Sequence, residues 1–303
     1  MTSSINVSQV DVRLLRVFST VVECGGFTPA QVAMNVSQST ISSHMAALEA
    51  RLDMRLCERG RAGFRITQNG NRVYEAAQRL FRSIDSFSSE VEALRGRLTG
   101  ELHIATIDSV ANNPKFALSS ALAKFTKRHG DVQISLQVAT PAEIERAIVE
   151  GRHHIGIGAY TKQISAIEYT ALMPESQLLY CSSKHPLFEA RADSIQAPDL
   201  ARHKFIKRPY VPDGHIPSSE FLNAAAFAEN MEATAMLILS GGFIGFLPEH
   251  YAARWVASGE MKTVLPDRMH YETGLELILR KTVPHTLAAQ YLKADLLEAF
   301  GLS

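Results

Sequence analysis

Seven apolar residues, spaced alternately four and three positions apart, constrain the fold of this chain most strongly. A repeat of about 3.5 residues puts all seven side chains on one narrow face of a long helix, as in a coiled-coil seam. We predict a helix over 68–94 that dimerises through this seam. A helix packed on its own domain would also carry an apolar stripe, although a wider one, and that alternative stays open. The seam comprises Val73, Ala77, Leu80, Ile84, Phe87, Val91 and Leu94.

The residues before this helix predict a helix-turn-helix. An amphipathic helix containing Leu14–Val22 ends at two consecutive glycines. Thr28 followed by Pro29 predicts the N-cap and first turn of a short second helix. After a turn near Asn35, Ser37 is placed to cap a third helix. Two helices joined by so short a turn have the proportions of a helix-turn-helix. The apolar face of the third helix comprises Ile41, Met45, Leu48 and Leu52.

The opposite side of the third helix is small and polar, with Ser39, Ser43, Ala46 and Ala50 along its centre. Solvated helix faces usually carry Lys and Glu, whereas short side chains let a helix sit deep in the major groove of DNA. Gln38, in the first turn, can bond adenine through two atoms. We therefore predict that this helix recognises DNA.

A small hairpin, or wing, is predicted over 56–67, where two extended runs flank a Gly-Arg-Ala-Gly turn. It carries Arg59, Arg61 and Arg65, which we expect to neutralise phosphates. Residues 1–97 contain twelve Arg, no Lys and nine acidic residues, hence a net charge of +3. The whole chain has 31 basic and 31 acidic residues, which excludes a uniformly basic protein. Any nucleic-acid contact must therefore be local.

Beyond Arg97 the pattern changes to short apolar runs that alternate with helical stretches. Two glycines, Gly96 and Gly100, mark the break. Such alternation predicts an α/β region with mainly parallel strands and helices on the faces of the sheet. A helix over 114–129 and strands over 102–107, 132–138 and 154–159 are expected, and Thr140 with Glu143 predicts a capping box that opens another helix.

The segment Phe27–Glu49, together with Leu56–Arg59 and Ile66–Gly70, resembles the DNA-binding signature of LysR-type transcriptional regulators, and the looser similarity downstream covers nearly the whole chain. The resemblance implies a winged helix-turn-helix in 1–67, a linker helix and hinge in 68–99, and a two-lobed effector domain like a type II periplasmic receptor in 100–303. The lobes would comprise 100–161 with 268–303, and 162–267. It also implies a homotetramer that binds promoter DNA, responds to a small-molecule effector and contacts RNA polymerase.

The resemblance also implies site residues. The family's recognition positions fall on Ser37, Gln38, Ser39, Thr40, Ser42 and Ser43, with Thr28 in the same motif. Ser43 stands where Arg is frequent in the family, which leaves more of the recognition to Gln38, His44 and the wing. For the effector, which we expect to be anionic, the cleft positions are Ser109, Thr140, Tyr160, Lys207 and Arg208. Ser109 and Thr140 could instead serve only as helix caps.

Two other classes of protein remain open at this stage. One is a small-molecule receptor or enzyme whose N-terminal helices only dimerise, and the other is a constitutive, ligand-free DNA-binding protein. No nucleophile elbow, P-loop or zinc-protease motif is present, so no enzymatic activity or cofactor is expected. The three cysteines are far apart, and we expect neither a metal site nor a redox pair. A polar N-terminus and the lack of a long apolar run favour a cytoplasmic protein away from the membrane.

Overall fold

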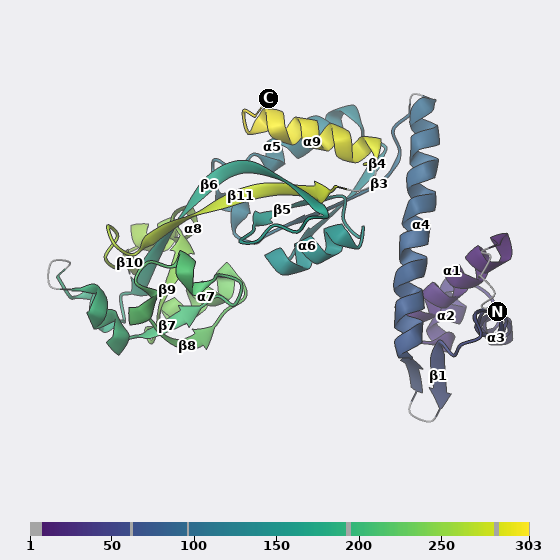
Figure 1. The fold of residues 1–303 in the computed structure, drawn as a ribbon, viewed down its shortest axis with the longest axis horizontal. Helices are drawn as coiled ribbons and strands as arrows, with labels where there is room; N and C mark the ends of the chain where they lie inside the picture. The colour runs from purple at the N-terminus through teal and green to yellow at the C-terminus, as the bar shows by residue number, and fades with distance from the viewer. Residues whose placement is uncertain (1–7, 61–62, 96, 192–194, 282–284, 303) are drawn as a thin grey trace. The chain divides into compact units, whose positions relative to one another are not determined.

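The computed structural model describes residues 8–60, 63–95, 97–191, 195–281 and 285–302, which form two compact units divided between Ser88 and Ser89. The first unit contains three helices, a hairpin and most of a long fourth helix (Figure 1). These elements are α1 (Gln9–Glu23), α2 (Phe27–Met34), α3 (Gln38–Leu52), β1 (Cys57–Gly60), β2 (Gly63–Ile66) and α4 (Gln68–Leu94). The predicted helix-turn-helix, hairpin and long helix are all present.

The core of the first unit joins α1 to α3. Phe18 and Val21 of α1 pack with Ile41, Met45 and Leu48 of α3, and all five are almost completely buried. The predicted apolar face of α3 is therefore its inner face. Between α2 and α3 the chain turns at a residue with left-handed backbone, Asn35.

The prediction for the start of α2 was wrong. The helix begins at Phe27 with Gly26 as its N-cap, so Thr28 lies inside the first turn and does not cap it. Phe27 is buried and meets the ring of Phe64 edge-on, with 6.0 Å between ring centroids. This contact with the hairpin explains the earlier start, because it draws Phe27 into the helix and core.

The second unit is built on one sheet. Within the described residues, nine strands pair in the order β4-β3-β5-β11-β6-β9-β7-β8, and β10 pairs with β6. The strands are β3 (Gly100–Thr106), β4 (Val132–Val138), β5 (Ile155–Ala159), β6 (Ile167–Ser182), β7 (Lys204–Lys207), β8 (Asn223–Phe227), β9 (Ile244–Pro248), β10 (Met261–Thr263) and β11 (His270–Arg280). Two long strands, β6 and β11, run through both lobes (Figure 1).

The expectation of a mainly parallel sheet was wrong. Strands β3, β4 and β5 are parallel in one lobe, and β7, β8 and β9 are parallel in the other. The two crossing strands pair antiparallel with each other, and each also pairs antiparallel with a strand of one lobe. The reason is topological, since a chain that crosses to the second lobe and returns must run in both directions.

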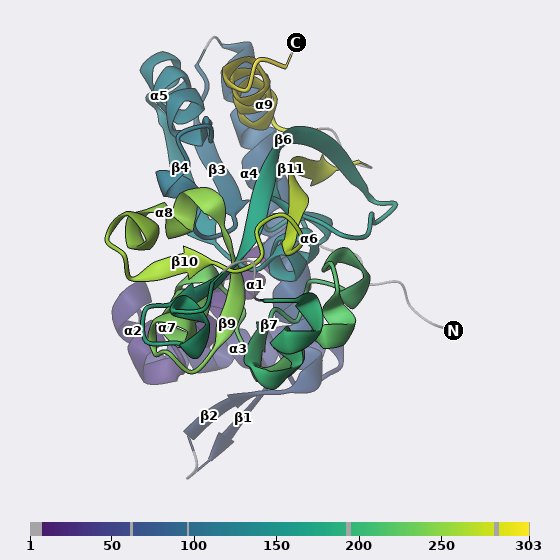
Figure 2. The same cartoon turned by 90° about the vertical axis from the view of Figure 1, so that its left-hand side faces the viewer.

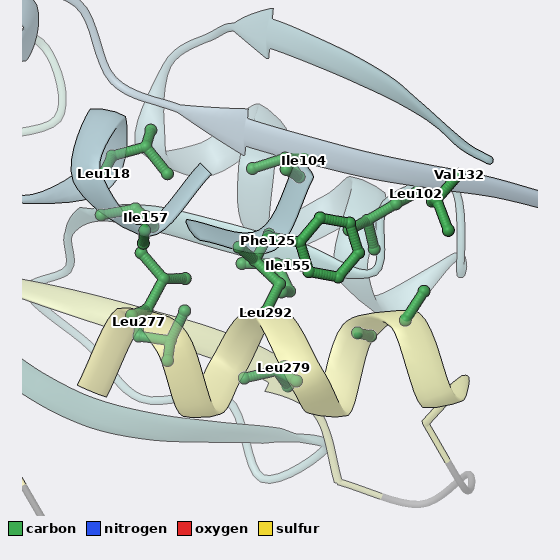
Figure 3. Packing of buried hydrophobic residues seen from close by; sticks show 14 of the residues in the cluster. Leu102, Ile104, Leu118, Phe125, Val132, Ile155, Ile157, Leu277, Leu279 and Leu292 are labelled. Carbon is green, nitrogen blue, oxygen red and sulfur yellow. The ribbon is translucent and has the colours of Figure 1, made fainter. Parts of the chain in front are cut away.

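The first lobe is a three-layer structure. Helices α5 (Leu118–Arg128) and α9 (Leu287–Ala299) lie side by side over one face of the sheet, and α6 (Pro141–Val149) packs on the other (Figure 2). Phe125 of α5 and Leu292 of α9 meet strand residues such as Ile155 and Leu277 in a fully buried cluster (Figure 3). The predicted helix over 114–129 is shorter at its start, because the chain turns at Asn113 and enters the helix only at Leu118.

The second lobe repeats this plan on a smaller scale. Helices α7 (Met231–Leu239) and α8 (Glu249–Ala257) cover one face of β9 and β7, and connecting segments cover the other. Asn230 caps α7 by accepting a hydrogen bond from the amide of Ala233 at 2.8 Å. This cap fixes the first turn of α7.

Candidate functional site

The outer edge of α3 is polar and accessible. Gln38, Ser39 and Ser43 are exposed, while Thr40, Ser42 and His44 are half-buried. Ser37 caps the helix by accepting a hydrogen bond from the amide of Thr40 at 3.2 Å. The hydroxyls of Ser39 and Thr40 both lie 2.8 Å from the Ser37 hydroxyl. The start of α3 therefore presents a cluster of hydroxyl groups beside an exposed amide side chain.

The hairpin lies next to this edge. A shallow hollow of about 350 Å³ is lined by Thr28 at the start of α2, Gln38 of α3 and Phe64 of the hairpin. Arg65 is exposed and pairs with Glu58 at 3.1 Å. Arg61 lies outside the described residues, and of Arg59 only the backbone is described, paired with Phe64 in the ladder.

Two carboxylates that the sequence analysis did not single out hold α3 in place. Asp11 of α1 forms a double hydrogen-bonded ion pair with Arg51 of α3, and this pairing holds the pKa of Asp11 well below its usual range. Glu49 accepts hydrogen bonds from the amides of Leu56 and Cys57 at 2.8 and 3.3 Å. The outer edge of α3 is thus fixed relative to both α1 and the hairpin.

The seam residues of α4 divide between two environments. Ala77 is 2% exposed and Val73 packs on the first unit's core, whereas Phe87 is 67% and Leu94 87% exposed. Leu80, Ile84 and Val91 are half-buried. The first part of the stripe therefore serves the domain's own core, and the later part has apolar side chains open to solvent.

A cavity of about 480 Å³ lies between the two lobes of the second unit. Of the five residues expected to bind an effector, Ser109, Thr140 and Arg208 line it. Thr140 also caps α6, in a capping box with Glu143. The Ser109 hydroxyl is buried and has no hydrogen-bond partner among the described residues.

Lys207 and Tyr160 do not line this cavity. Arg208, which follows β7 directly, lines the cavity, whereas Lys207, the last residue of β7, borders a separate hollow of about 200 Å³. Tyr160 packs on Tyr169, with 5.6 Å between ring centroids. Burial and nearby carboxylates raise the pKa of Tyr160, which keeps its phenol neutral.

The innermost wall of the cavity is charged. Arg208 is buried and donates to the Gln177 side-chain oxygen at 2.9 Å and to the Tyr271 hydroxyl at 2.6 Å. Glu175 is 5% exposed, and burial raises its pKa to about 7. Burial also raises the pKa of Asp108.

Two hydrogen bonds connect the lobes beside this wall. Asp108, at the end of β3, accepts from the amide of Met231 at the start of α7, at 2.5 Å. The side chain of His250 in α8 lies 3.0 Å from the carbonyl oxygen of Ser109. The cavity is thus closed on one side by contacts between residues more than a hundred positions apart in the chain.

Sequence reasoning missed Asp108, Glu175, Gln177, His250 and Tyr271. A signal existed for two of them. Glu175 and Gln177 alternate with exposed or half-buried residues of β6 and occupy its buried face. A polar residue on the inner face of a strand needs a partner, and that requirement singles out a site.

Among the described residues, no cluster of His, Cys, Asp and Glu could hold a metal ion. Cys181 is buried, and burial raises its pKa to about 11.

Comparisons with known proteins agree over most of the chain. The model "Bacterial regulatory helix-turn-helix protein, lysR family" matches residues 12–71, and "LysR substrate binding domain" matches residues 95–301. The chain is 41% identical over 291 residues to the HTH-type transcriptional activator BauR of Pseudomonas aeruginosa, covering 95% of each chain. It is 33% identical over 208 residues to the probable HTH-type transcriptional regulator LrrA of Synechococcus elongatus, covering 66% of each.

Solved structures share the architecture. CbnR, a LysR family transcriptional regulator, aligns over 95% of this chain and 98% of its own, with a TM-score of 0.67 and 21% identity. Full-length CbnR complexed with its target DNA aligns over 95% of this chain and 99% of its own, with a TM-score of 0.68 and 22% identity. In this chain, none of the described helices has the length and apolar character needed to cross a membrane.

Proposed function

Because the chain belongs to the LysR family of DNA-binding transcriptional regulators, we propose that the outer edge of α3 recognises operator DNA and that a small molecule in the cavity controls transcription. Its relatives regulate transcription and are not enzymes, so the enzyme alternative is set aside. The domain assignment that we propose is 1–67 for DNA binding, 68–99 for the linker and 100–303 for effector binding.

The proposal that α3 recognises DNA rests on the contrast between the two sides of this helix. Its inner side is fully packed, so only the edge with Gln38, Ser39 and Ser43 is free to enter a groove. Gln38 supplies the two-point contact to adenine, worth about 1–3 kcal/mol of discrimination between bases. The hydroxyls of Ser37, Thr40 and Ser42, with Thr28 and His44, position the helix, and Arg59, Arg61 and Arg65 contact phosphates.

To test this proposal, the DNA sequences that the purified full-length protein binds are selected from a random pool. The affinity of each variant for the selected operator is then measured. Gln38→Ala should relax base preference at one position. Arg65→Ala should weaken binding to all sequences and reduce the salt slope by about one unit. Arg79→Ala removes the same charge from the exposed surface of α4 and serves as the control. Equal losses from Arg65→Ala and Arg79→Ala would remove the wing from the interface.

The second part rests on the cavity that both lobes line. A ligand there contacts Ser109 and Thr140 from one lobe and Arg208 from the other, and so its binding free energy depends on how the lobes are arranged. A buried guanidinium favours an anionic group such as a carboxylate, which it can bind through two parallel hydrogen bonds. The constitutive alternative predicts that no metabolite alters the affinity of the protein for its operator, or its melting temperature.

The quaternary structure that we propose is based on α4. We infer that the exposed part of the seam pairs two chains, so that two α3 helices enter successive major grooves, and that two such dimers form a homotetramer. Effector binding would change how the dimers are arranged and hence the bend of the DNA. Contact with RNA polymerase and a cytoplasmic location complete the proposal.

A further inference from the structure

The charges at the inner wall of the cavity do not balance. Asp108, Glu175 and Arg208 meet there, and the rest of the cavity lining adds the titratable residues Glu143, His215, Glu229 and Glu232. His250 lies beside Glu175, but burial lowers the pKa of its imidazole and so favours the neutral form at pH 7. When Glu175 is ionised, it carries together with Asp108 and Arg208 one excess negative charge, and a buried site of that kind attracts a cation.

Glu175 is the group without a full set of partners. One of its carboxylate oxygens, Oε2, accepts a hydrogen bond from the Gln177 amide at 2.8 Å. The other, Oε1, is buried and has no hydrogen-bond partner among the described residues. The nearest cationic candidate is His250 Nδ1, at 3.7 Å. An unsatisfied carboxylate oxygen in a closed site costs free energy, and a ligand ammonium group would supply the missing donor.

Arg208 lacks a carboxylate partner in the same way. The acceptors of its guanidinium are neutral and include the Gln177 amide oxygen, the Tyr271 hydroxyl and the Met231 sulfur, with the Tyr210 side chain as a further neutral partner. Within the part of the chain that the structure describes, no carboxylate oxygen lies within ion-pair distance of it. Its planar fork of donors matches a carboxylate.

Gln177 keeps these two opposite charges apart. Its side-chain oxygen accepts from Arg208 and its amide nitrogen donates to Glu175. A buried charge without a compensating partner is costly, and direct contact between Glu175 and Arg208 would compensate both charges. Here an amide stands between them, and both charges remain available to the cavity.

We propose that the effector is a zwitterionic amino acid, whose ammonium group pairs with Glu175 and Asp108 and whose carboxylate pairs with Arg208. This inference rests on the proposed effector control. Ile107, Val138 and Met231 line the same cavity, so its walls accept a hydrocarbon body between or beyond the two charged groups.

The experiment measures binding to the full-length chain by calorimetry and thermal shift. The probes are α-amino acids and ω-amino acids of increasing length, each tested beside the carboxylic acid without the amine and the amine without the carboxylate. At least one amino acid should bind about tenfold more tightly than both of its one-charge analogues. A carboxylic acid that binds as tightly as its amino acid would overturn the inference.

Variants assign the ammonium contact. Glu175→Gln should reduce the preference for the amino acid over its deaminated analogue about tenfold. Glu272→Gln makes the same change at an exposed carboxylate of β11 that does not line the cavity, and it should keep the preference. An undiminished preference in Glu175→Gln would contradict the assignment.

A pH profile of the wild-type chain gives a measurement that does not depend on any variant folding. Glu175 faces Arg208, Asp108 and His250, and burial raises its own pKa to about 7. Protonation of Glu175 removes its attraction for an ammonium group, so amino-acid affinity should rise from about pH 6 to pH 8. A flat profile would count against the inference.

The same preparations distinguish the proposed amino-acid effector from the proposed DNA-binding function. Operator binding by a chain that no amino acid in the panel stabilises would reject the zwitterion and leave the DNA-binding function standing. Failure to bind any selected DNA would reject the proposed function itself.

Discussion

At the scale of single residues, Gly70 shows why one position in the N-terminal signature accepts no side chain. A Cβ there would lie 2.0 Å from the carbonyl oxygen of Leu56, which is backbone and cannot move aside. The amide of Gly70 donates to the Thr67 hydroxyl at 2.9 Å, and that hydroxyl lies 2.8 Å from the Arg55 carbonyl oxygen. The hairpin is thereby fastened to the first turn of α4.

We predict that Gly70→Ala destabilises the first unit by about 1–3 kcal/mol, the usual cost of overpacking. Gly274→Ala is a matched control, because nothing lies within 4 Å of the Cβ that it adds. Urea unfolding of the full chain measures both. A Gly70→Ala chain as stable as the control would show that the hairpin moves without cost.

Glu175 gives a second prediction at this scale. Its pKa in the folded chain, about 7, is raised above the unfolded value of about 4.3. The folded state therefore binds more protons between these values, and stability falls as the pH rises through them. Glu175→Gln should remove this loss and raise the free energy of unfolding above pH 7 by up to about 3 kcal/mol. Thermal unfolding of the wild-type and Glu175→Gln chains across this pH range measures the difference. A carboxylate whose pKa is lowered on folding would instead make the substitution destabilising.

At the scale of elements, one apolar stripe of α4 lies in two different environments. Near its start, Ala77 and Phe81 are buried in the first unit, and the guanidinium of Arg16 lies 4.7 Å from the centre of the Phe81 ring. Farther along, Phe87 and Leu94 are exposed. The heptad pattern is the same in both parts, so spacing alone could not separate packing within the domain from the surface proposed for dimerisation.

We predict that Phe87→Asp dissociates the proposed dimer while the first unit stays folded, because the charge falls on an exposed apolar position. Ser86→Asp adds the same charge one position earlier, off the seam, and should leave the mass unchanged. Light scattering gives the mass and circular dichroism the fold. A dimer that persists in Phe87→Asp would mean that the exposed stripe pairs with nothing.

At the scale of the whole effector region, distant segments meet at the cavity. Asp108 follows β3, Glu175 lies in β6, and Arg208 follows β7. The crossing strands bring these positions together, and the hydrogen bond from Met231 to Asp108 connects the lobes. A ligand that displaced or strengthened this bond would change the arrangement of the lobes, as population shift requires.

We predict that Asp108→Ala frees the Met231 amide and speeds its hydrogen exchange about tenfold or more, because the amide loses its only described acceptor. Asp131→Ala removes an exposed carboxylate in the same lobe and is the control. Exchange measured by mass spectrometry resolves the start of α7. Unchanged exchange there would mean that the lobes do not depend on this contact.

The sequence alone determined the features that depend on neighbours in the chain. Helical periodicity, caps and glycine turns are local features. The helix-turn-helix, the hairpin, the long helix and the alternation of strands and helices in the second unit could therefore be predicted from residue spacing. The tertiary structure decided what depends on distant segments: the antiparallel crossing strands, the different surroundings of Ala77 and Phe87, and the separation of Lys207 from Arg208. It also decided the charged wall of the cavity, because burial and the placement of opposite charges arise only when segments far apart in the chain pack together.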